Sequence, residues 1–423
     1  MLLKKFLNNS NNISKDSYIW NMTGNMLNAF QSVIFLMIIT RVVSLYEAGL
    51  FTIANANANL FLYIGKYGMR NFQVSDVNNQ FSFKEYKISR YITSIIMTLT
   101  SFLYVLIAAN ANHYTKEKSL IIIWMCLLKV IDSVEDVYLG LYQQKNRLDI
   151  SGKCITVRMV ATILILAVCL FIFKALLPAL IISTIASTII CIICIFLTFD
   201  GFKNDTNSIK EFSMSATFKL LRICFPLFLG LFLGYYIGNA PKYAIDSNLS
   251  DELQAIYGFI SMPVFVIGLL NNFIFNPILA RMSLMWHEKQ ITSFKKLLKK
   301  QTLIIIGITL ICEAGAFIIG IPVLSIIYNT NLAGYKLELL ILLLGGGFLA
   351  FSGLLVTTIT IMRKQNVIAA IYLIVAIIAL IMSPIFVKQY AIMGAVNVYL
   401  ILMVLSCILF GGSVLFILHK KAD

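Results

Sequence analysis

The sequence predicts an all-α integral membrane protein of about twelve transmembrane helices in two six-helix bundles. Apolar residues make up 59% of the 423-residue chain and charged residues only 13%, and the mean hydropathy is +0.87. A water-soluble protein has about 25% charged residues, so most of this surface must face something other than water. The apolar residues also come in blocks of about 20, enough for a helix to cross ~30 Å of hydrocarbon. The blocks do not alternate with polar residues, which favours helices over barrel strands.

The apolar blocks give the positions of the expected helices. In chain order we expect spans at Ser17–Thr40, Glu47–Lys66, Tyr91–Ala109, Ser119–Tyr142, Cys154–Phe173, Leu176–Phe199, Leu220–Ala240, Gln254–Asn276, Gln301–Tyr328, Lys336–Met362, Val367–Val387 and Ile392–Leu418. The polar segment Asp200–Thr217 falls at the midpoint of the chain, with six spans on either side. It divides the chain into an N-terminal bundle (1–199), a cytoplasmic linker (200–218) and a C-terminal bundle (219–423). Paired bundles are typical of alternating-access transporters.

The distribution of Lys and Arg predicts the orientation in the membrane. Of the 34 such residues, 26 are counted to the side of the tails and of the loops after the even-numbered spans, Arg90 and Arg158 among them. Only seven fall on the other side, and Lys129 lies within a span. Positive residues collect on the cytoplasmic side, so both termini are expected there. An even number of spans agrees with this orientation.

Two stripes of polar residues run along the first two spans. Asn21, Asn25 and Asn28 follow helical spacing in the first span, and the second span has a longer stripe. The members of that second stripe are Asn55, Asn59, Tyr63, Lys66 and Arg70, while Asn57 points to the opposite side. Hydrogen bonds between helices would explain both stripes. We favour the alternative, a hydrophilic cavity wall that binds sugar hydroxyls, because the stripes occupy neighbouring helices.

Acidic residues within spans are candidates for ion coupling. Lys129 neutralises one carboxylate, Asp132, in an i,i+3 pair, and this leaves Asp136 to titrate or to bind a cation. The alternative is a self-contained cluster of ion pairs near the inner interface. Glu313 is a single acid among apolar residues, and is either a coupling site or a carboxyl kept protonated by its surroundings.

Three other segments carry structural predictions. In the seventh span Gly230, Gly234 and Gly238 form a ridge for close packing, and the following segment Asn239–Lys242 is expected to break the helix at the outer edge. Gly345–Gly347 is either flexible or closely packed. The basic run Lys295–Lys300 predicts an amphipathic helix on anionic membrane lipid, in a loop too short to bind nucleic acid.

Enzymatic motifs are weak throughout the sequence. The histidines lie far apart, Cys191 and Cys194 have no partner residues for a metal, and nucleotide and hydrolase motifs are missing. We therefore expect a transporter with no catalytic residues, no metal site and no cofactor. Its energy would come from a gradient of H⁺ or Na⁺, from the membrane potential or from mass action.

Two segments, Tyr67–Arg90 and Asn239–Pro263, together with the layout of the whole chain, resemble the Wzx-like polysaccharide-unit flippases of the MOP exporter superfamily. The resemblance implies a MATE-like pair of bundles around a cationic cavity in a bacterial cytoplasmic membrane. The implied cargo is an oligosaccharide or teichoic-acid precursor linked to undecaprenyl (pyro)phosphate, moved from the inner to the outer leaflet. Other polysaccharide-assembly proteins are implied partners. The candidate cations for the pyrophosphate are Lys66, Arg70, Lys129, Arg41 and Lys242.

Other functions stay open at this point. MATE-type multidrug antiporters commonly carry an acid in the first span, where this chain has asparagines. The lipid II flippases are expected to have an arginine deep in the first span, whereas Arg41 lies at its far end. A membrane polymerase or ligase is disfavoured because the outer loops are short. A non-transporting scaffold is disfavoured by the polar stripes.

Overall fold

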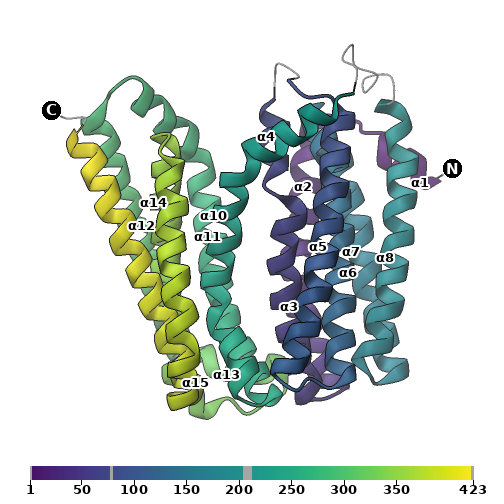
Figure 1. Ribbon diagram of the computed structural model, residues 1–423, viewed down its shortest axis with the longest axis vertical. Helices are drawn as coiled ribbons and strands as arrows, with labels where there is room; N and C mark the ends of the chain where they lie inside the picture. The colour runs from purple at the N-terminus through teal and green to yellow at the C-terminus, as the bar shows by residue number, and fades with distance from the viewer. Residues whose placement is uncertain (1, 77–79, 203–211, 421–423) are drawn as a thin grey trace. The chain divides into compact units, whose positions relative to one another are not determined.

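The structure is a computed structural model that describes residues 2–76, 80–202 and 212–420, without the side chains of 271–277, 280 and 420. In these ranges the chain is helical and forms no strand (Figure 1). The chain divides into two compact units, Met1–Phe232 and Leu233–Asp423, called here unit 1 and unit 2. The predicted all-α architecture is confirmed.

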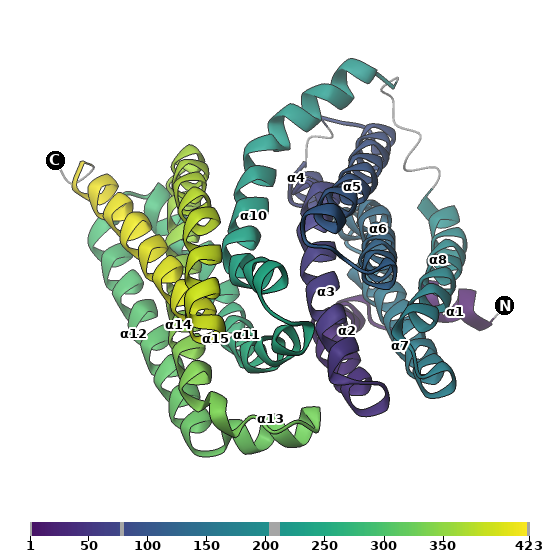
Figure 2. The same cartoon turned by 60° about the horizontal axis from the view of Figure 1, so that its bottom comes forward.

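Unit 1 is a bundle of long helices. They are α1 (Leu2–Asn8), α2 (Ile13–Val42), α3 (Leu45–Lys66), α4 (Met69–Ser75), α5 (Phe83–Ala111), α6 (Lys116–Gln144), α7 (Leu148–Phe173), α8 (Leu176–Phe199), the 3₁₀ turn η1 (Asp200–Phe202) and the first part of α10 (Met214–Asn248). In both views α3, α5 and α6 lie side by side, and α2 packs along α7 (Figures 1 and 2).

Side-chain caps explain where several of these helices begin. The Ser44 hydroxyl accepts from the Glu47 amide at 3.1 Å at the start of α3. Ser82 and Glu85 form a reciprocal capping box at the start of α5. Such caps satisfy amide groups that the first turn of a helix leaves without partners. The box starts α5 at Phe83, well ahead of the predicted start of that span at Tyr91.

Glycines let the helices of unit 1 approach closely. A Cβ at Gly152 of α7 would overlap the backbone of Trp20 and Asn21 in α2. At Gly65 of α3 it would lie 2.6 Å from the hydroxyl of Ser133 in α6. Small residues allow backbones to pack without a strong hydrophobic force between helices, as packing within lipid requires.

Unit 2 contains the remaining helices. They are the rest of α10, α11 (Asp251–His287), α12 (Ile291–Gly315), the π-helical turn η2 (Ala316–Gly320), α13 (Ile321–Tyr328), the 3₁₀ turn η3 (Ala333–Tyr335), α14 (Lys336–Ile361) and α15 (Gln365–Lys420). α15 is two helices joined at Ala391, whose φ of 50° and ψ of −131° are not helical. Tyr372 precedes Ala391 and Phe410 follows it, yet the centroids of their rings lie 5.0 Å apart. The two parts therefore form a hairpin, as the predicted eleventh and twelfth spans require.

Two details of unit 2 differ from the prediction. Asn239–Lys242 does not break the helix, because α10 continues through Pro241 and ends at Asn248. The predicted ninth span is divided by η2 and Pro322 into α12 and α13, and Figure 2 shows α13 turned away from the axis of α12. A π-helical turn and a proline are common causes of such a kink.

The basic run and the glycines of unit 2 lie within its long helices. The run Lys295–Lys300 is not a separate interfacial helix, because it belongs to the N-terminal part of α12. Gly345 and Gly347 are closely packed, since an added Cβ would lie 2.6 Å from the Tyr399 ring and 2.5 Å from Thr309. Of the glycine ridge in α10, Gly234 packs against Tyr372, whereas Gly238 has open space.

The described helices account for about twelve membrane spans. Nine helical segments are long and apolar enough to cross a membrane, and one of these, Gln365–His419, contains the two arms of the hairpin. The two further spans are α3 and α6, whose polar and charged residues set them apart. The contact division falls inside α10, so Met214–Phe232 belongs to unit 1 although the predicted C-terminal bundle begins at residue 219. The predicted domain limits stay predictions, and residues 203–211 of the predicted linker lie outside the described ranges.

Candidate substrate-binding face and ion-pair cluster

The middle of α3 exposes amide side chains and nothing else. From Ala48 to Phe61 every residue is buried except Asn55 and Asn59, which are half-buried. Tyr63 and Lys66 continue the same row toward the C-terminal end of the helix and are also half-buried. Between Ala48 and Phe61 the accessible strip of this helix is therefore narrow and polar.

The stripes on α2 and α3 lie on two consecutive helices that run antiparallel. The chain reverses at Val43–Ser44 and the two helices pack together. Asn28 of α2 and Asn59 of α3 are equally far from this reversal in the sequence, so they lie level with each other. Asn25 and Asn28 are exposed, and Asn21 is half-buried. We call the combined surface the polar face of unit 1; its members are Asn21, Asn25, Asn28, Ser32, Asn55, Asn59, Tyr63 and Lys66.

The asparagines of the polar face do not join helices together. The Asn25 amide donates to the Asn21 carbonyl at 2.7 Å, and the Asn59 amide donates to the Asn55 carbonyl at 2.9 Å. Both bonds lie within one helix, and among described residues none of these asparagines hydrogen-bonds another helix. Asn57 points away from the face and is fully buried. Interhelical bonding therefore does not explain these asparagines.

The accessible faces of α5 and α8 have the opposite character. Leu99 and Leu106 of α5 are each 64% exposed, and Phe196 of α8 is 70% exposed. Among described residues, α3 has no exposed large apolar side chain and α6 has only Leu120. Apolar faces suit contact with lipid tails, whereas accessible amides at membrane depth suit a water-filled cavity.

Near the Lys66 end of the polar face, Asp136 of α6 pairs with two arginines. Arg90 of α5 donates from Nη2 to Asp136 Oδ2 at 2.8 Å, and the Arg90 side chain is fully buried. Arg70 of α4 approaches Asp136 Oδ1 at 3.4 Å and also donates to the Gln143 side chain at 3.0 Å. The Arg70 side chain keeps 26% of its surface exposed. One carboxylate thus connects a buried arginine with an accessible one.

A second group of ion pairs lies on the N-terminal side of Asp136 in α6. Arg158 of α7 donates from Nη2 to Asp132 at 2.7 Å and to Glu135 at 2.6 Å. Lys129 lies 3.0 Å from the other oxygen of Asp132 and 3.4 Å from Gln31 of α2. The predicted i,i+3 pair of Lys129 and Asp132 is confirmed. We call the two groups together the α6 cluster; its members are Arg70, Arg90, Lys129, Arg158, Asp132, Glu135 and Asp136.

The expectation that one carboxylate of α6 lacks a cationic partner is wrong. Asp132 pairs with Lys129 and Arg158, and Asp136 pairs with Arg70 and Arg90. The prediction considered α6 alone, whereas the arginines come from its neighbours α4, α5 and α7. Lys129, predicted to contact cargo, is itself buried in the cluster.

The remaining predicted residues lie elsewhere. Arg41 is exposed in the last turn of α2, and the length of α3 separates it from Lys66 by roughly 30 Å at 1.5 Å per residue. Lys242 of α10 and Glu313 of α12 belong to unit 2 and are half-buried. Lys66 ends the α3 row, but Arg70 does not continue it, because the chain leaves the helix at Tyr67 and Gly68 and Arg70 belongs to α4. The predicted stripe along one helix from Asn55 to Arg70 is therefore wrong at its last member. Arg41 lies at the opposite end of α3 from Lys66.

The sequence prediction missed two important residues, Arg90 and Arg158. Both were assigned to polar loops in the charge count, yet both are buried within helices. The capping-box pattern of Ser82 and Glu85 signals an earlier helix start and so places Arg90 inside α5. Arg158 already lay inside the predicted span Cys154–Phe173, where an arginine requires an acidic partner.

Comparisons with known proteins agree with this fold. Residues 14–283, more than half of the chain, match the family described as polysaccharide biosynthesis protein. The capsular polysaccharide biosynthesis protein CapF of Staphylococcus aureus is 22% identical over 383 residues, which cover 90% of this chain and 93% of that protein. An inward-facing multidrug resistance MATE family transporter of the MOP superfamily has a TM-score of 0.68 at 13% identity, covering 97% of this chain and 98% of that one. The lipid II flippase MurJ, in an inward closed conformation, has a TM-score of 0.70 at 13% identity, covering 95% and 87%. The chain therefore belongs to the polysaccharide biosynthesis protein family and has the multi-pass membrane fold of the MOP superfamily.

Proposed function

We propose that this protein is an alternating-access flippase for lipid-linked polysaccharide precursors, a transporter rather than an enzyme. The cargo is an oligosaccharide or teichoic-acid precursor linked to undecaprenyl (pyro)phosphate. It moves from the inner to the outer leaflet of a bacterial cytoplasmic membrane, and both chain termini lie in the cytoplasm. Membership of the polysaccharide biosynthesis family and the names of CapF and the lipid II flippase support this cargo class.

The observation that carries the proposal is the accessible strip of α3. Between Ala48 and Phe61 the chain buries every side chain except two amides. The Asn59 amide N–H groups donate to Asn55, which leaves the Asn59 oxygen as an acceptor and the Asn55 amide N–H groups as donors for the hydroxyl groups of a sugar. Polar groups at membrane depth are costly unless they face water or a polar ligand, so this strip supports a path for a hydrophilic cargo.

The charges beside the strip support an anionic group on the cargo. The α6 cluster contains four cations and three carboxylates, so it has an excess of one positive charge. Lys66 adds one more positive charge beside this cluster. It attracts both Asp132 and Asp136 but forms no ion pair with a described residue. Of these cations Arg70 and Lys66 are the accessible ones. Both act on the same carboxylate, Asp136, and a guanidinium and an ammonium of this kind suit a phosphate or pyrophosphate.

The energy source of this transport is a further part of the proposal. Proton or sodium coupling through Asp132 or Asp136 would require one of their ion pairs to open. Glu313 forms no ion pair with a described residue and is half-buried in α12. Glu313 is therefore the better candidate for ion coupling. Slower transport in Glu313→Gln, with an altered dependence on pH or sodium, would support this role.

Deletion of the gene tests the flippase function. The deletion strain is expected to accumulate lipid-linked repeat units on the inner leaflet, and the wild-type gene is expected to restore surface glycan. A double variant, Lys66→Ala with Arg70→Ala, should insert into the membrane but fail to restore it. Arg222→Ala, which removes an exposed cation of α10, is the matched control. Normal surface glycan in a deletion strain without a second flippase would contradict the proposal.

A cation-coupled multidrug antiporter is the alternative. The likeness to a solved MATE transporter fits this function as well as the likeness to the lipid II flippase fits the flippase. The deletion strain separates the two functions. An antiporter predicts greater sensitivity to cationic drugs with normal surface glycan. A flippase predicts the reverse.

A further inference from the structure

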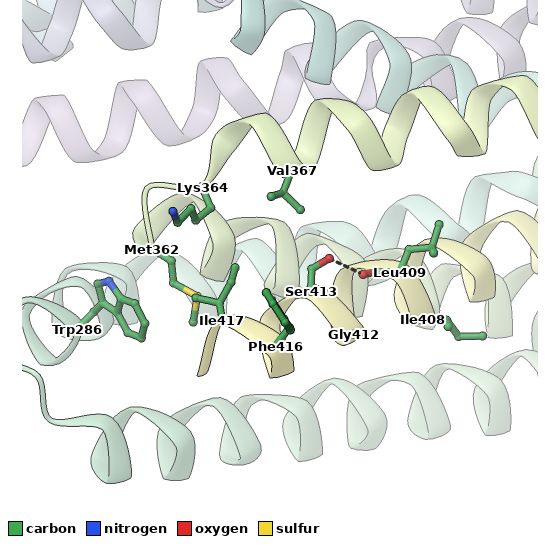
Figure 3. Close-up of a pocket in the computed structure, with 10 residues that line it drawn as sticks. All are labelled: Trp286, Met362, Lys364, Val367, Ile408, Leu409, Gly412, Ser413, Phe416 and Ile417. Carbon is green, nitrogen blue, oxygen red and sulfur yellow. Dashed lines mark hydrogen bonds between the residues drawn. The ribbon is translucent and has the colours of Figure 1, made fainter. Parts of the chain in front are cut away.

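Unit 2 contains a lateral cavity that the proposed transport path does not use. Its volume is about 790 Å³, within the ~300–1,000 Å³ typical of ligand sites. α11, the turn between α14 and α15, the start of the first arm of α15 and its second arm form the walls (Figure 3). Ile408 and Phe416 in these walls are 64% and 69% exposed, so the cavity opens sideways.

The main wall of the cavity is apolar and about one leaflet deep. It follows α15 from Ile408 to Ile417, about 14 Å at 1.5 Å per residue. Half of a ~30 Å hydrocarbon layer has nearly the same depth. The Ser413 hydroxyl donates to the Leu409 carbonyl at 2.9 Å, as the dashed line in Figure 3 marks, so it is satisfied within its own helix. The wall is thus suited to a hydrocarbon chain.

One end of the cavity has the chemistry of a membrane interface. Lys364 and Trp286 line it there, and Arg363 precedes Lys364 in the turn. The Trp286 ring packs on Phe294 of α12, with centroids 5.3 Å apart. Phe294 begins the basic segment of α12, whose lysines are Lys295, Lys296, Lys299 and Lys300. Tryptophan prefers the headgroup level of a bilayer, and clustered cations attract anionic headgroups.

We propose that this cavity binds one anionic glycerophospholipid of the surrounding bilayer. An acyl chain lies along the α15 wall and the phosphate group lies at Lys364. The one-leaflet depth favours an acyl chain over a longer isoprenoid, and the apolar wall favours a lipid over free phosphate. The site is separate from the polar face of unit 1, and the proposal does not depend on the identity of the transported cargo.

Lipid binding to the full-length protein in detergent tests the proposal. Native mass spectrometry and thermal unfolding would compare phosphatidylglycerol with phosphatidylcholine of the same chain length. Wild-type protein should prefer phosphatidylglycerol by about fivefold, the factor expected from ~1 kcal/mol per surface lysine. Lys364→Ala should remove this preference. Lys388→Ala, which removes an exposed cation near the bend of α15 at Ala391, should retain it.

A cavity-filling variant gives an independent test. Gly412 lines the cavity and has open space around its Cβ position, so Gly412→Leu should block the binding of both lipids. Gly353 of α14 has the same open surroundings but does not line the cavity, so Gly353→Leu should bind as wild type does. Equal binding of the two lipids by wild-type protein, or an unchanged preference in Lys364→Ala, would overturn the proposal. Tighter binding of undecaprenyl phosphate than of phosphatidylglycerol would also overturn it, because the site would then belong to the carrier lipid.

Discussion

Arg90 and Asp136 form a 2.8 Å ion pair in which the arginine side chain is fully buried. Arg90 also donates to the Gly65 carbonyl at 2.8 Å, so it joins the C-terminal turn of α3 to α5 and α6. Arg70 contacts the opposite oxygen of the same carboxylate while remaining accessible. The geometry therefore separates an arginine that stabilises the bundle from one that is available to bind cargo.

The first prediction concerns these two arginines. Arg90→Met should lower the free energy of unfolding by about 3–5 kcal/mol, because it removes a cation from a buried pair. Arg70→Met should lower it by no more than about 1 kcal/mol, since this partly exposed side chain makes a weaker pair. Arg70→Met should nevertheless reduce the restoration of surface glycan in a deletion strain. Unfolding in detergent and the glycan assay measure the two effects, and equal losses of stability would contradict the distinction.

A second prediction concerns Arg158, which neutralises two carboxylates at once. Arg158→Met should also cost about 3–5 kcal/mol, because Glu135 then loses its paired cation. Adding Glu135→Gln should recover part of that stability, and a double-mutant cycle measures the coupling. Arg222→Met, at an exposed site on α10, should change stability by less than about 0.5 kcal/mol. Simple additivity of the Arg158 and Glu135 changes would show that the pair contributes no coupling.

The sequence predicts the helices of this protein much better than it predicts the contacts between them. Block length places all twelve spans, because each helix must cross the same hydrocarbon thickness. The α2 and α3 stripes are also predictable, since residues on one face of one helix follow a fixed spacing.

Contacts between helices require information that one helix does not contain. The partners of Asp132 and Asp136 come from α4, α5 and α7, which are up to 66 residues away in sequence. Lys129 was predictable as a partner of Asp132 because both lie on α6. Its burial was not predictable, because burial depends on Gln31 of α2 and on the packing of the whole bundle.

A third prediction tests the close approach of α2 and α7. Gly152→Ala would place a Cβ against the backbone of Trp20 and Asn21, where no flexible side chain can move aside. Overpacking of this kind costs about 1–3 kcal/mol, and here it would also displace the start of the α2 stripe. At Gly307 of α12 the Cβ position is open, so Gly307→Ala should be neutral or stabilising by up to about 1 kcal/mol. Thermal unfolding of both variants measures the difference, and equal Tm values would show that α2 and α7 tolerate a wider separation.

The last prediction compares two asparagines of the same helix. Asn57 is fully buried, and neither atom of its amide has a hydrogen-bond partner within the described chain. Asn57→Leu should therefore raise the free energy of unfolding by about 1–3 kcal/mol, because it removes a desolvated polar group.

Asn59 follows Asn57 by half a turn of α3 and faces the opposite way, as part of the polar face. Asn59→Leu should leave stability nearly unchanged, because the bond it removes is to its own helix. It should reduce transport, since an apolar side chain would interrupt the row of amides that offers hydrogen bonds to a sugar. Thermal unfolding and the surface-glycan assay, run on both variants, separate the two roles. Normal transport in Asn59→Leu together with lost transport in Asn57→Leu would place the path for cargo on the other side of α3.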